Sequence, residues 1–488
     1  MILFPALLCA LSGVLMLVLS FLEHKKEKKL LPGNPGVYTV VILAISVAVC
    51  MYCTWFTSVD VTLMSFLDSF SIRFCQDALG RLFLTASSVI WLVVSIYSCE
   101  YMKQEDNTKR FYGFFLLVYS VLICLDSAGN LITFYFFYEF MTLTSLPLVL
   151  HHQTKEALMA GLKYLLYSMA GAYFALFGIY VLSQNTATLD FIPGGSLQST
   201  STTVMLACFF LILGFGAKAG MLPLHAWLPT AHPAAPAPAS AALSAIIVKG
   251  GVLAIIRSIF YVAGAQKLRG TWVQSTWMVL ALLTVFMGSM IAFRQKEFKK
   301  RLAYSTVSQA SYILFGLSLL EPMAFTGALL HFVFHACIKA ALFLTAGAFI
   351  FHTGKHQVSE YPGIGKKLPM ATWGYTLASL GLIGIPPVCG FISKWYLALG
   401  SLQSDTGVIS VIGPVVLLVS ALLTAGYLLP IMWNGFFGAK AEPAYKNEWK
   451  SPMSVSIALL ALLAVWMGVF PDRLVEYMAG ISCMVFGK

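Results

Sequence analysis

Fourteen long apolar runs, separated by short loops, make up most of this sequence. Each run approaches the roughly 20 apolar residues that a helix needs to cross a bilayer. Only 10% of the residues are charged, against about 25% in soluble domains. The sequence therefore predicts an all-α polytopic membrane protein of about fourteen transmembrane helices, which start near Ile2, Val37, Leu79, Phe111, Ala128, Ala157, Thr202, Ser240, Thr271, Leu302, Met323, Met370, Val408 and Pro452.

The basic residues are distributed unevenly among the loops. Loops after odd-numbered runs hold nineteen Lys and Arg residues, and loops after even-numbered runs hold three. Because positive loops stay in the cytoplasm, we expect a multi-pass protein of the cell membrane with both termini outside. The lysines near the first run, such as Lys25, follow it and do not precede it, so this run is a span and not a signal peptide. The net charge of +11 is thus explained by topology, and no nucleic-acid partner is expected.

Prolines interrupt two of the runs. "GAKAGMLPLHAWLP" in the seventh run contains Pro223 and Pro229, and "GLIGIPPVCGFISKWYLALG" in the twelfth contains Pro386 and Pro387. Interrupted helices at corresponding positions of two halves are typical of transporters built from inverted repeats. The five-span separation of the breaks gives the two halves opposite orientation.

This pattern divides the chain into four parts. We expect N-terminal helices 1–3 in residues 1–110, a first inverted five-helix repeat in 111–263, a second in 264–435 and a final helix in 436–488.

Several ionisable residues lie deep inside the apolar runs. A charge at the bilayer centre costs about 2.5–3.5 kcal/mol on insertion scales, so such residues face protein or water and are functional candidates. Burial favours the neutral forms of lysine and glutamate, and a chain of such groups suits proton transfer. The candidates are Glu139, Lys218, Lys249, His331, His335, Lys339 and Lys394.

Three of these candidates share one helix face. His331, His335 and Lys339 are spaced by four residues, which places them one above another over about 12 Å.

Other interpretations of the polar residues remain open at this stage. Glu139 and Lys218 could form an inert ion pair. His225 and His232 could satisfy backbone carbonyls that the breaks leave free. Arg257 and Lys163, near the ends of their runs, are expected to extend toward the membrane surface.

The cysteines do not indicate a metal site. Cys50 and Cys53 have a zinc-like spacing, but they lie in an apolar run without a second pair. We expect no metal, no cofactor and no catalytic residue in this chain.

The motifs around the breaks resemble one family. "KAGMLPLHAWLPTAHPAAPAPASAALSAIIVKGGV", "RLAYSTVSQASYI", "HFVFHACIKAALFLTAG" and "GIPPVCGFISKWY" are similar to landmarks of the antiporter-like subunits of respiratory complex I, Mrp-type sodium/proton antiporters and membrane-bound energy-converting hydrogenases. The resemblance covers roughly residues 75–435. It implies fourteen helices, two inverted five-helix repeats and broken helices seven and twelve.

The resemblance also implies roles for the buried residues. By motif position, Glu139 is the helix-five glutamate paired with Lys218, Lys249 is the central relay of helix eight, and Lys394 lies at the exit side. The helix-eleven pattern matches His331, His335 and Lys339, with His225, His232, Pro223, Pro386 and Pro387 in supporting positions.

The chain departs from the family pattern at several positions. Thr230 stands where an acid is common and Ala235 where a larger polar residue is common. Lys249 disfavours the branch of the family that carries a histidine-rich motif in helix eight. Lys394 disfavours the branch that carries glutamate at this position, and the absence of a lateral helix disfavours the distal complex I subunit. These departures favour an Mrp-like or hydrogenase-like subunit.

The sequence therefore predicts a proton- or sodium-translocating subunit of a larger membrane complex, surrounded by lipid and other membrane subunits and driven by redox chemistry in its partners. One alternative is a module of a sodium/proton antiporter without a redox partner. A second is a structural membrane anchor, which has no need for a continuous line of polar groups.

Overall fold

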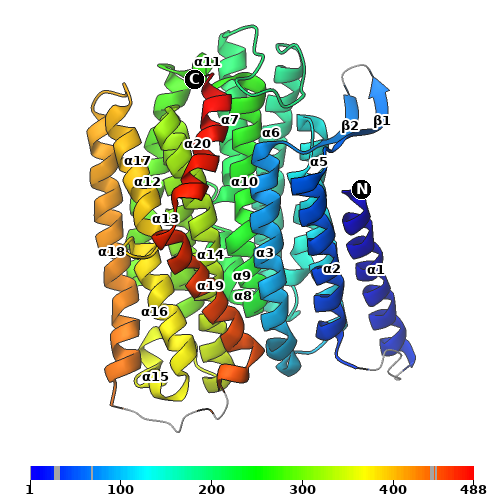
Figure 1. The fold of residues 1–488 in the computed structure, drawn as a ribbon, viewed down its shortest axis with the longest axis vertical. Coiled ribbons are helices and arrows are strands. Elements are labelled where there is room, and N and C mark those ends of the chain that lie inside the picture. Colours follow the sequence, from blue (N-terminus) through cyan, green and yellow to red (C-terminus); the bar gives the residue numbers. More distant parts are fainter. Residues whose placement is uncertain (1, 27–32, 68–69, 440–444, 446–447, 488) are drawn as a thin grey trace.

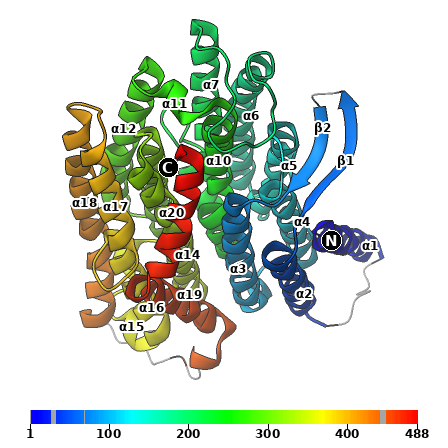
Figure 2. The same ribbon diagram turned by 45° about the horizontal axis from the view of Figure 1, so that its top comes forward.

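A computed structural model describes the chain except residues 1, 27–32, 68–69, 440–444, 446–447 and 488, and the described part is mostly helical. Figures 1 and 2 show the long helices packed side by side in one bundle. Four lysines of the basic loops, Lys28, Lys29, Lys440 and Lys446, lie outside the described residues.

Twelve helical segments of the described part are long and apolar enough to cross a membrane. They are α1 (Leu3–Lys26), α2 (Pro35–Phe56), α3 (Ala78–Tyr101, extended by the 3₁₀ turn Met102–Gln104), α4 (Thr108–Asp126), α5 (Leu131–Val149), α6 (Lys155–Ser183), α7 (Thr202–Ala219), the composite helix of residues 237–263, α12 (Trp272–Arg294), α14 (Pro322–Thr353), α18 (Ile409–Phe437) and α19 (Pro452–Val469).

Two further predicted spans are also helical. The tenth is α13 (Phe298–Ser318), a helix rich in serine and buried against α12 and α14. The twelfth is divided into α16 (Pro369–Ile383) and α17 (Gly390–Gln403). An all-α polytopic membrane protein is thus confirmed, and the short remaining elements are α8 (Leu228–Ala234), α11 (Ala265–Leu268), α15 (Ile364–Lys367), α20 (Asp472–Phe486) and the 3₁₀ turns Val358–Glu360 and Glu448–Lys450.

Two helices form the centre of the bundle. The most apolar window of the composite helix is 100% buried, and that of α14 is 89% buried. The composite helix consists of α9 (Ala237–Ala242), a π-helical segment (Leu243–Ile247), α10 (Val248–Ile255) and a second π-helical segment (Ile256–Ala263). These central helices carry Lys249, His331, His335 and Lys339, so these four predicted site residues lie in the interior of the bundle.

Both predicted breaks are present, and a glycine ends the helix before each. Gly220 caps α7 with φ 80°, and Gly384 caps α16 with φ 94°. This left-handed conformation costs other residues energy and is the usual helix stop. Pro223, Pro386 and Pro387 follow these glycines within three residues, where a helix cannot continue, and Pro229 lies in the first turn of α8.

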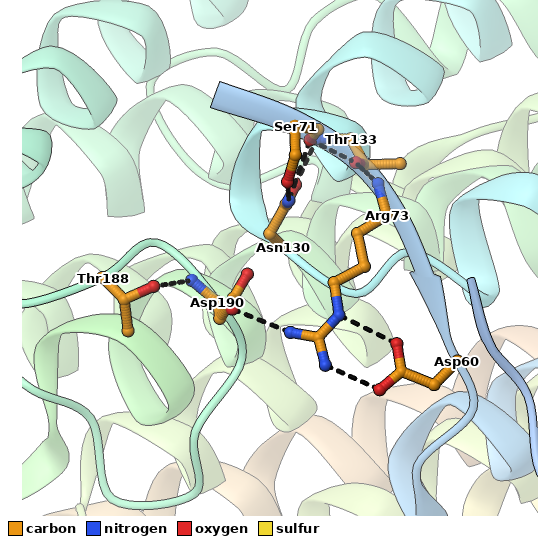
Figure 3. Close-up of polar contacts among 7 residues, drawn as sticks. All are labelled: Asp60, Ser71, Arg73, Asn130, Thr133, Thr188 and Asp190. Atoms are coloured by element: carbon orange, nitrogen blue, oxygen red, sulfur yellow. Dashed lines mark hydrogen bonds and ion pairs between the residues drawn. The ribbon is translucent and has the colours of Figure 1, made fainter. Parts of the chain in front are cut away.

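A β-hairpin between α2 and α3 was not predicted. β1 (Asp60–Leu67) pairs antiparallel with β2 (Phe70–Cys75), with Asp60 opposite Cys75. Arg73 donates two hydrogen bonds to Asp60 and one to Asp190 of the loop before α7, at 2.7–2.9 Å (Figure 3). Asn130, at the start of α5, donates to the carbonyl oxygen of Ser71 at 2.9 Å. These bonds fix the hairpin to the end of the bundle opposite α15 (Figure 1).

Candidate functional site

Lys218 lies in the last turn of α7, just before the first break, and is fully buried. Its ammonium donates to three hydroxyl groups: Thr142 of α5 at 2.6 Å, and Tyr164 and Ser168 of α6 at 3.1 and 3.2 Å. An ammonium has three N–H donors. The three hydroxyls therefore satisfy the protonated lysine completely without a neighbouring anion.

Glu139 lies on the same helix as Thr142 but does not pair with Lys218. Its carboxylate makes no ion pair within 4 Å among the described residues, and its Oε1 is buried without a hydrogen-bond partner. Its helical neighbours Phe136 and Phe140 are exposed. The inert ion pair considered from the sequence is therefore wrong, and Glu139 lies toward the lateral surface of the chain, one helical turn from a ligand of Lys218.

Serine, lysine and tryptophan side chains satisfy the carbonyls around the first break. Trp227 donates to the carbonyl of Ala217 at 2.8 Å, Ser240 donates to that of His232 at 2.7 Å, and Lys299 donates to that of Ala235 at 2.9 Å. Both ring nitrogens of His232 are buried without a partner. The carbonyls of Ala217, His232 and Ala235 are therefore satisfied by other side chains.

Lys249 lies on α10, between the two π-helical segments, and is 1% exposed. Its Nζ donates to the carbonyl oxygen of Ser244, a residue of the first π-helical segment. Gly251, two residues after Lys249, has no room for a side chain, because a Cβ there would come within 2.5 Å of the Phe215 carbonyl oxygen and 3.0 Å of the Cβ of Lys218. The glycine thus lets the helix of Lys249 pack directly on the helix of Lys218.

A polar bridge connects the surroundings of Lys249 to α14. The hydroxyl of Ser244 bonds that of Thr306 on α13 at 2.8 Å. The preceding residue of α13, Ser305, accepts a hydrogen bond from Lys339, which also donates to the carbonyl of Leu302 at 2.9 Å. Lys249 and Lys339 are therefore both anchored around one polar stretch of α13.

The predicted column on α14 is present and faces the interior. The rings of His331 and His335 are stacked with centroids 5.8 Å apart. His331 Nδ1 lies 2.9 Å from the hydroxyl of Ser393, the residue before Lys394. Both nitrogens of His335, the Nε2 of His331 and the side-chain amide of the nearby Gln309 are buried without partners. Unpartnered polar atoms of this kind are typical binding positions for internal water.

Lys394 lies in α17, just after the second break, and is half-buried. Its Nζ donates to the carbonyl oxygens of Leu382 and Ile383, the last residues of α16, at 2.7 and 2.8 Å. It also lies 5.2 Å from the centre of the Tyr312 ring, which stacks on His331. Lys394 thus caps the negative end of the other half-helix and adjoins the histidine column.

The prediction that Arg257 extends toward the membrane surface is wrong. It is 1% exposed and makes two hydrogen bonds with Asp77, at 2.5 and 2.7 Å. Asp77 also caps α3 through the amide of Gly80, so the pair joins the start of α3 to the end of the composite helix. Nearby, the buried carboxylate of Asp126 accepts a hydrogen bond from Ser87.

Sequence reasoning missed two kinds of residue. Thr142, Tyr164 and Ser168 carry no charge, and nothing in their local sequence marks them as ligands of a lysine. Lys299 was counted as a loop cation, but it is 6% exposed at the start of α13. Among the described residues, no His, Cys, Asp and Glu side chains are grouped as metal ligands.

Comparisons with known proteins find relatives in sequence and in structure. A family model described as NADH:quinone oxidoreductase/Mrp antiporter, TM, matches residues 128–424. The chain is 32% identical to NADH-quinone oxidoreductase subunit N of Desulforudis audaxviator, over 83% of each chain. It is 31% identical to hydrogenase-4 component B of Escherichia coli, over 80% of this chain and 61% of the relative. A chain in the solved Mrp complex of Dietzia has the same fold, with a TM-score of 0.84, 19% identity, and coverage of 99% of this chain and 97% of that one.

Proposed function

Because the chain belongs to the NADH:quinone oxidoreductase/Mrp antiporter family of ion-translocating membrane subunits, we propose that the ion it carries is the proton. Protons would pass from Glu139 and Lys218 through Lys249 to the α14 column and then to Lys394. The observation that carries this proposal is the succession of titratable groups inside the bundle: Lys218 within its hydroxyls, Lys249 and Lys339 around one stretch of α13, and the stacked histidines beside Lys394.

A cavity of about 790 Å³ supports the entry of protons from the end of the bundle that carries the basic loops. Its lining includes Lys163 of α6, Pro229 and Thr230 of the first break, and Glu297 and Lys300 at the start of α13. Such a hollow brings solvent to the first break, from which protons would reach Lys218. The unpartnered nitrogens of His232 and His335 would hold water where the side chains do not touch each other.

The two breaks support the division of the chain into inverted repeats. Residues 111–263 would form the first repeat and residues 264–435 the second, with residues 1–110 and 436–488 flanking them. The lysine precedes the break in the first repeat and follows it in the second. This reversal is what two half-channels with opposite openings would need.

The basic loops would lie on the cytoplasmic side of a cell membrane, with both chain ends on the opposite side. In Figure 1, α1 begins and α20 ends toward the end of the bundle that carries the hairpin. This arrangement agrees with the positive-inside rule.

The driving energy would come from partner subunits. The two relatives are named as components of an NADH-quinone oxidoreductase and of a hydrogenase, and a partner that carries out redox chemistry would drive this chain in the same way. Lys249 and Lys394 favour the Mrp-like or hydrogenase-like branch. Purification of the assembled complex and identification of its other subunits tests this point: a redox subunit supports it, whereas membrane subunits alone favour a sodium/proton antiporter module.

The proton route is tested with Glu139→Gln in membrane vesicles that contain the assembled complex. A pH-sensitive dye should report proton uptake at least tenfold slower than in the unchanged complex, because the amide cannot carry a proton. Glu476→Gln, on the exposed face of α20, is the matched control and should have no effect. Unchanged uptake in the Glu139 variant, or a sodium flux that replaces proton uptake, would contradict the proposal.

A further inference from the structure

A second, smaller cavity lies away from the proposed proton route. It has a volume of about 400 Å³ and is enclosed by α2, α3, α14, α19 and α20. This volume is in the range of about 300–1,000 Å³ that is usual for small-molecule sites. Apart from Arg473, Thr85 and Tyr477, its lining is apolar or aromatic and includes Ile90, Cys337 and Leu463.

The cavity extends from the end of the helices into the membrane interior. Trp55, in the last turn of α2, and Leu82, in the first turns of α3, form its upper part. Along α3 the lining continues to Ile90, about 12 Å deeper at 1.5 Å per residue. On α14 it includes Ala336 and Cys337, the neighbours of His335. The inner end of the cavity therefore reaches the depth of the histidine column, on the opposite face of α14.

Aromatic side chains with polar edges mark the rim. The rings of Trp55 and Tyr477 lie 5.6 Å apart. The indole of Trp55 donates to the hydroxyl of Thr85 at 3.2 Å, and the hydroxyl of Tyr477 donates to the carbonyl of Ala78 at 2.8 Å. Tryptophan and tyrosine prefer the depth of lipid headgroups, so the rim has the chemistry of a membrane–water boundary.

Two guanidinium groups lie near this rim, Arg473 one helical turn deeper than Tyr477 along α20. Arg473 is exposed, lines the cavity and makes no ion pair among the described residues; it lies four residues before Tyr477 on one face of α20. Arg81 lies close enough to Tyr477 to interact with it electrostatically, and its Nε is buried without a hydrogen-bond partner. The acidic neighbours of Arg473 on α20, Asp472 and Glu476, do not line the cavity. Guanidinium groups bind phosphate through paired hydrogen bonds.

We propose that this cavity binds one phospholipid with an anionic headgroup, in the leaflet at the hairpin end of the bundle. The phosphate contacts Arg473, with Arg81 adding positive charge beside it, and one acyl chain fills the hollow down to Cys337 and Leu463. The bound chain packs against the back of α14, the helix whose other face carries His331 and His335.

Photolabelling of the assembled complex in native membranes tests the proposal. The probes are phosphatidylglycerol and phosphatidylcholine that carry the same diazirine in the middle of one acyl chain. After irradiation, peptide mapping should find label near Cys337 and Leu463, at least threefold stronger with phosphatidylglycerol. Equal labelling by both lipids, or label spread evenly over exposed helices such as α18, would overturn the assignment.

Two variants distinguish the contribution of the headgroup contact to labelling from that of the apolar hollow. Arg473→Gln should reduce the phosphatidylglycerol labelling to the phosphatidylcholine level. Ala86→Phe, which fills the hollow from α3, should reduce labelling by both lipids at least threefold. Arg294→Gln, an exposed arginine at the far end of α12, is the matched control and should leave both unchanged.

A photoreactive amino acid at position 85 tests whether another protein subunit, and not a lipid, occupies the cavity. In the assembled complex it should cross-link to lipid. A cross-link to another protein subunit would show that the cavity is a protein interface and would overturn the proposal.

Discussion

The two broken helices share a backbone design but hold their lysines in different ways. Each begins with a half-helix that ends at a glycine with positive φ, and each has a lysine beside the break. Lys218 is fully buried and bonds three side-chain hydroxyls from two other helices. Lys394 is half-buried and bonds two backbone carbonyls across its own break.

This difference has a chemical consequence. A hydroxyl can donate as well as accept a hydrogen bond, whereas a carbonyl only accepts. The hydroxyls around Lys218 can therefore rotate to serve either a charged or a neutral amine. The carbonyls around Lys394 favour the cation, and they add the negative end of the α16 dipole. The first break is suited to a change of protonation, and the second is suited to holding a proton until an external force removes it.

The largest effect is expected from replacing Lys218. Lys218→Ala removes the proton carrier, and Lys218→Arg keeps a charge that does not leave at cellular pH. Both should slow proton uptake by vesicles at least tenfold, with the complex still assembled. Lys163→Arg, on α6 beside the cavity, is the control and should leave uptake within twofold. Normal uptake with Lys218→Arg would mean that a fixed charge is sufficient at the first break.

An intermediate effect is expected from the hydroxyls around Lys218. Thr142→Val, Tyr164→Phe and Ser168→Ala each remove one partner while keeping the shape, and each should slow uptake about two- to tenfold, since one net hydrogen bond contributes about 0.5–1.5 kcal/mol. Thr144→Val is the matched control on α5, because its hydroxyl bonds only its own helix. If the control slows uptake as much as Thr142→Val does, the hydroxyl cage has no special role.

The smallest effect is expected from Lys394→Ala when the membrane potential is collapsed. If Lys394 releases protons against the potential, its loss should matter most at high potential, where one charge crossing 100 mV is worth about 2.3 kcal/mol. Uptake should be measured with and without a potassium ionophore, and the defect should shrink at least threefold when the potential is removed. A defect of the same size in both conditions would assign Lys394 a structural role.

The spans and the breaks could be predicted because their causes are local. Apolar length gave the helices, the proline pairs gave the interruptions, and four-residue spacing placed His331, His335 and Lys339 on one face. Each of these signals lies within a few turns of one helix, where geometry follows directly from sequence distance.

The partners of these residues could not be predicted in the same way. Tyr164 and Ser168 reach Lys218 from 54 and 50 residues away, and their positions follow from helix packing. Arg257 resembled a surface residue because Asp77, its partner, lies 180 residues earlier. The hairpin was missed because its short strands interrupt a chain dominated by helical periodicity. Its anchors Asp60, Arg73 and Asp190 become neighbours only after folding.

Lys249 offers the most direct measurement of the central claim, that one line of exchanging groups joins the two breaks. Proton uptake should be compared in vesicles with the unchanged complex, Lys249→Ala and Lys249→Arg, with assembly confirmed by purification. The account predicts that both variants lose at least tenfold in uptake, because alanine cannot bind a proton and arginine does not release one. Uptake at the unchanged rate with Lys249→Arg would contradict it, because Lys249 would then be a fixed charge and the two breaks would not exchange protons through it.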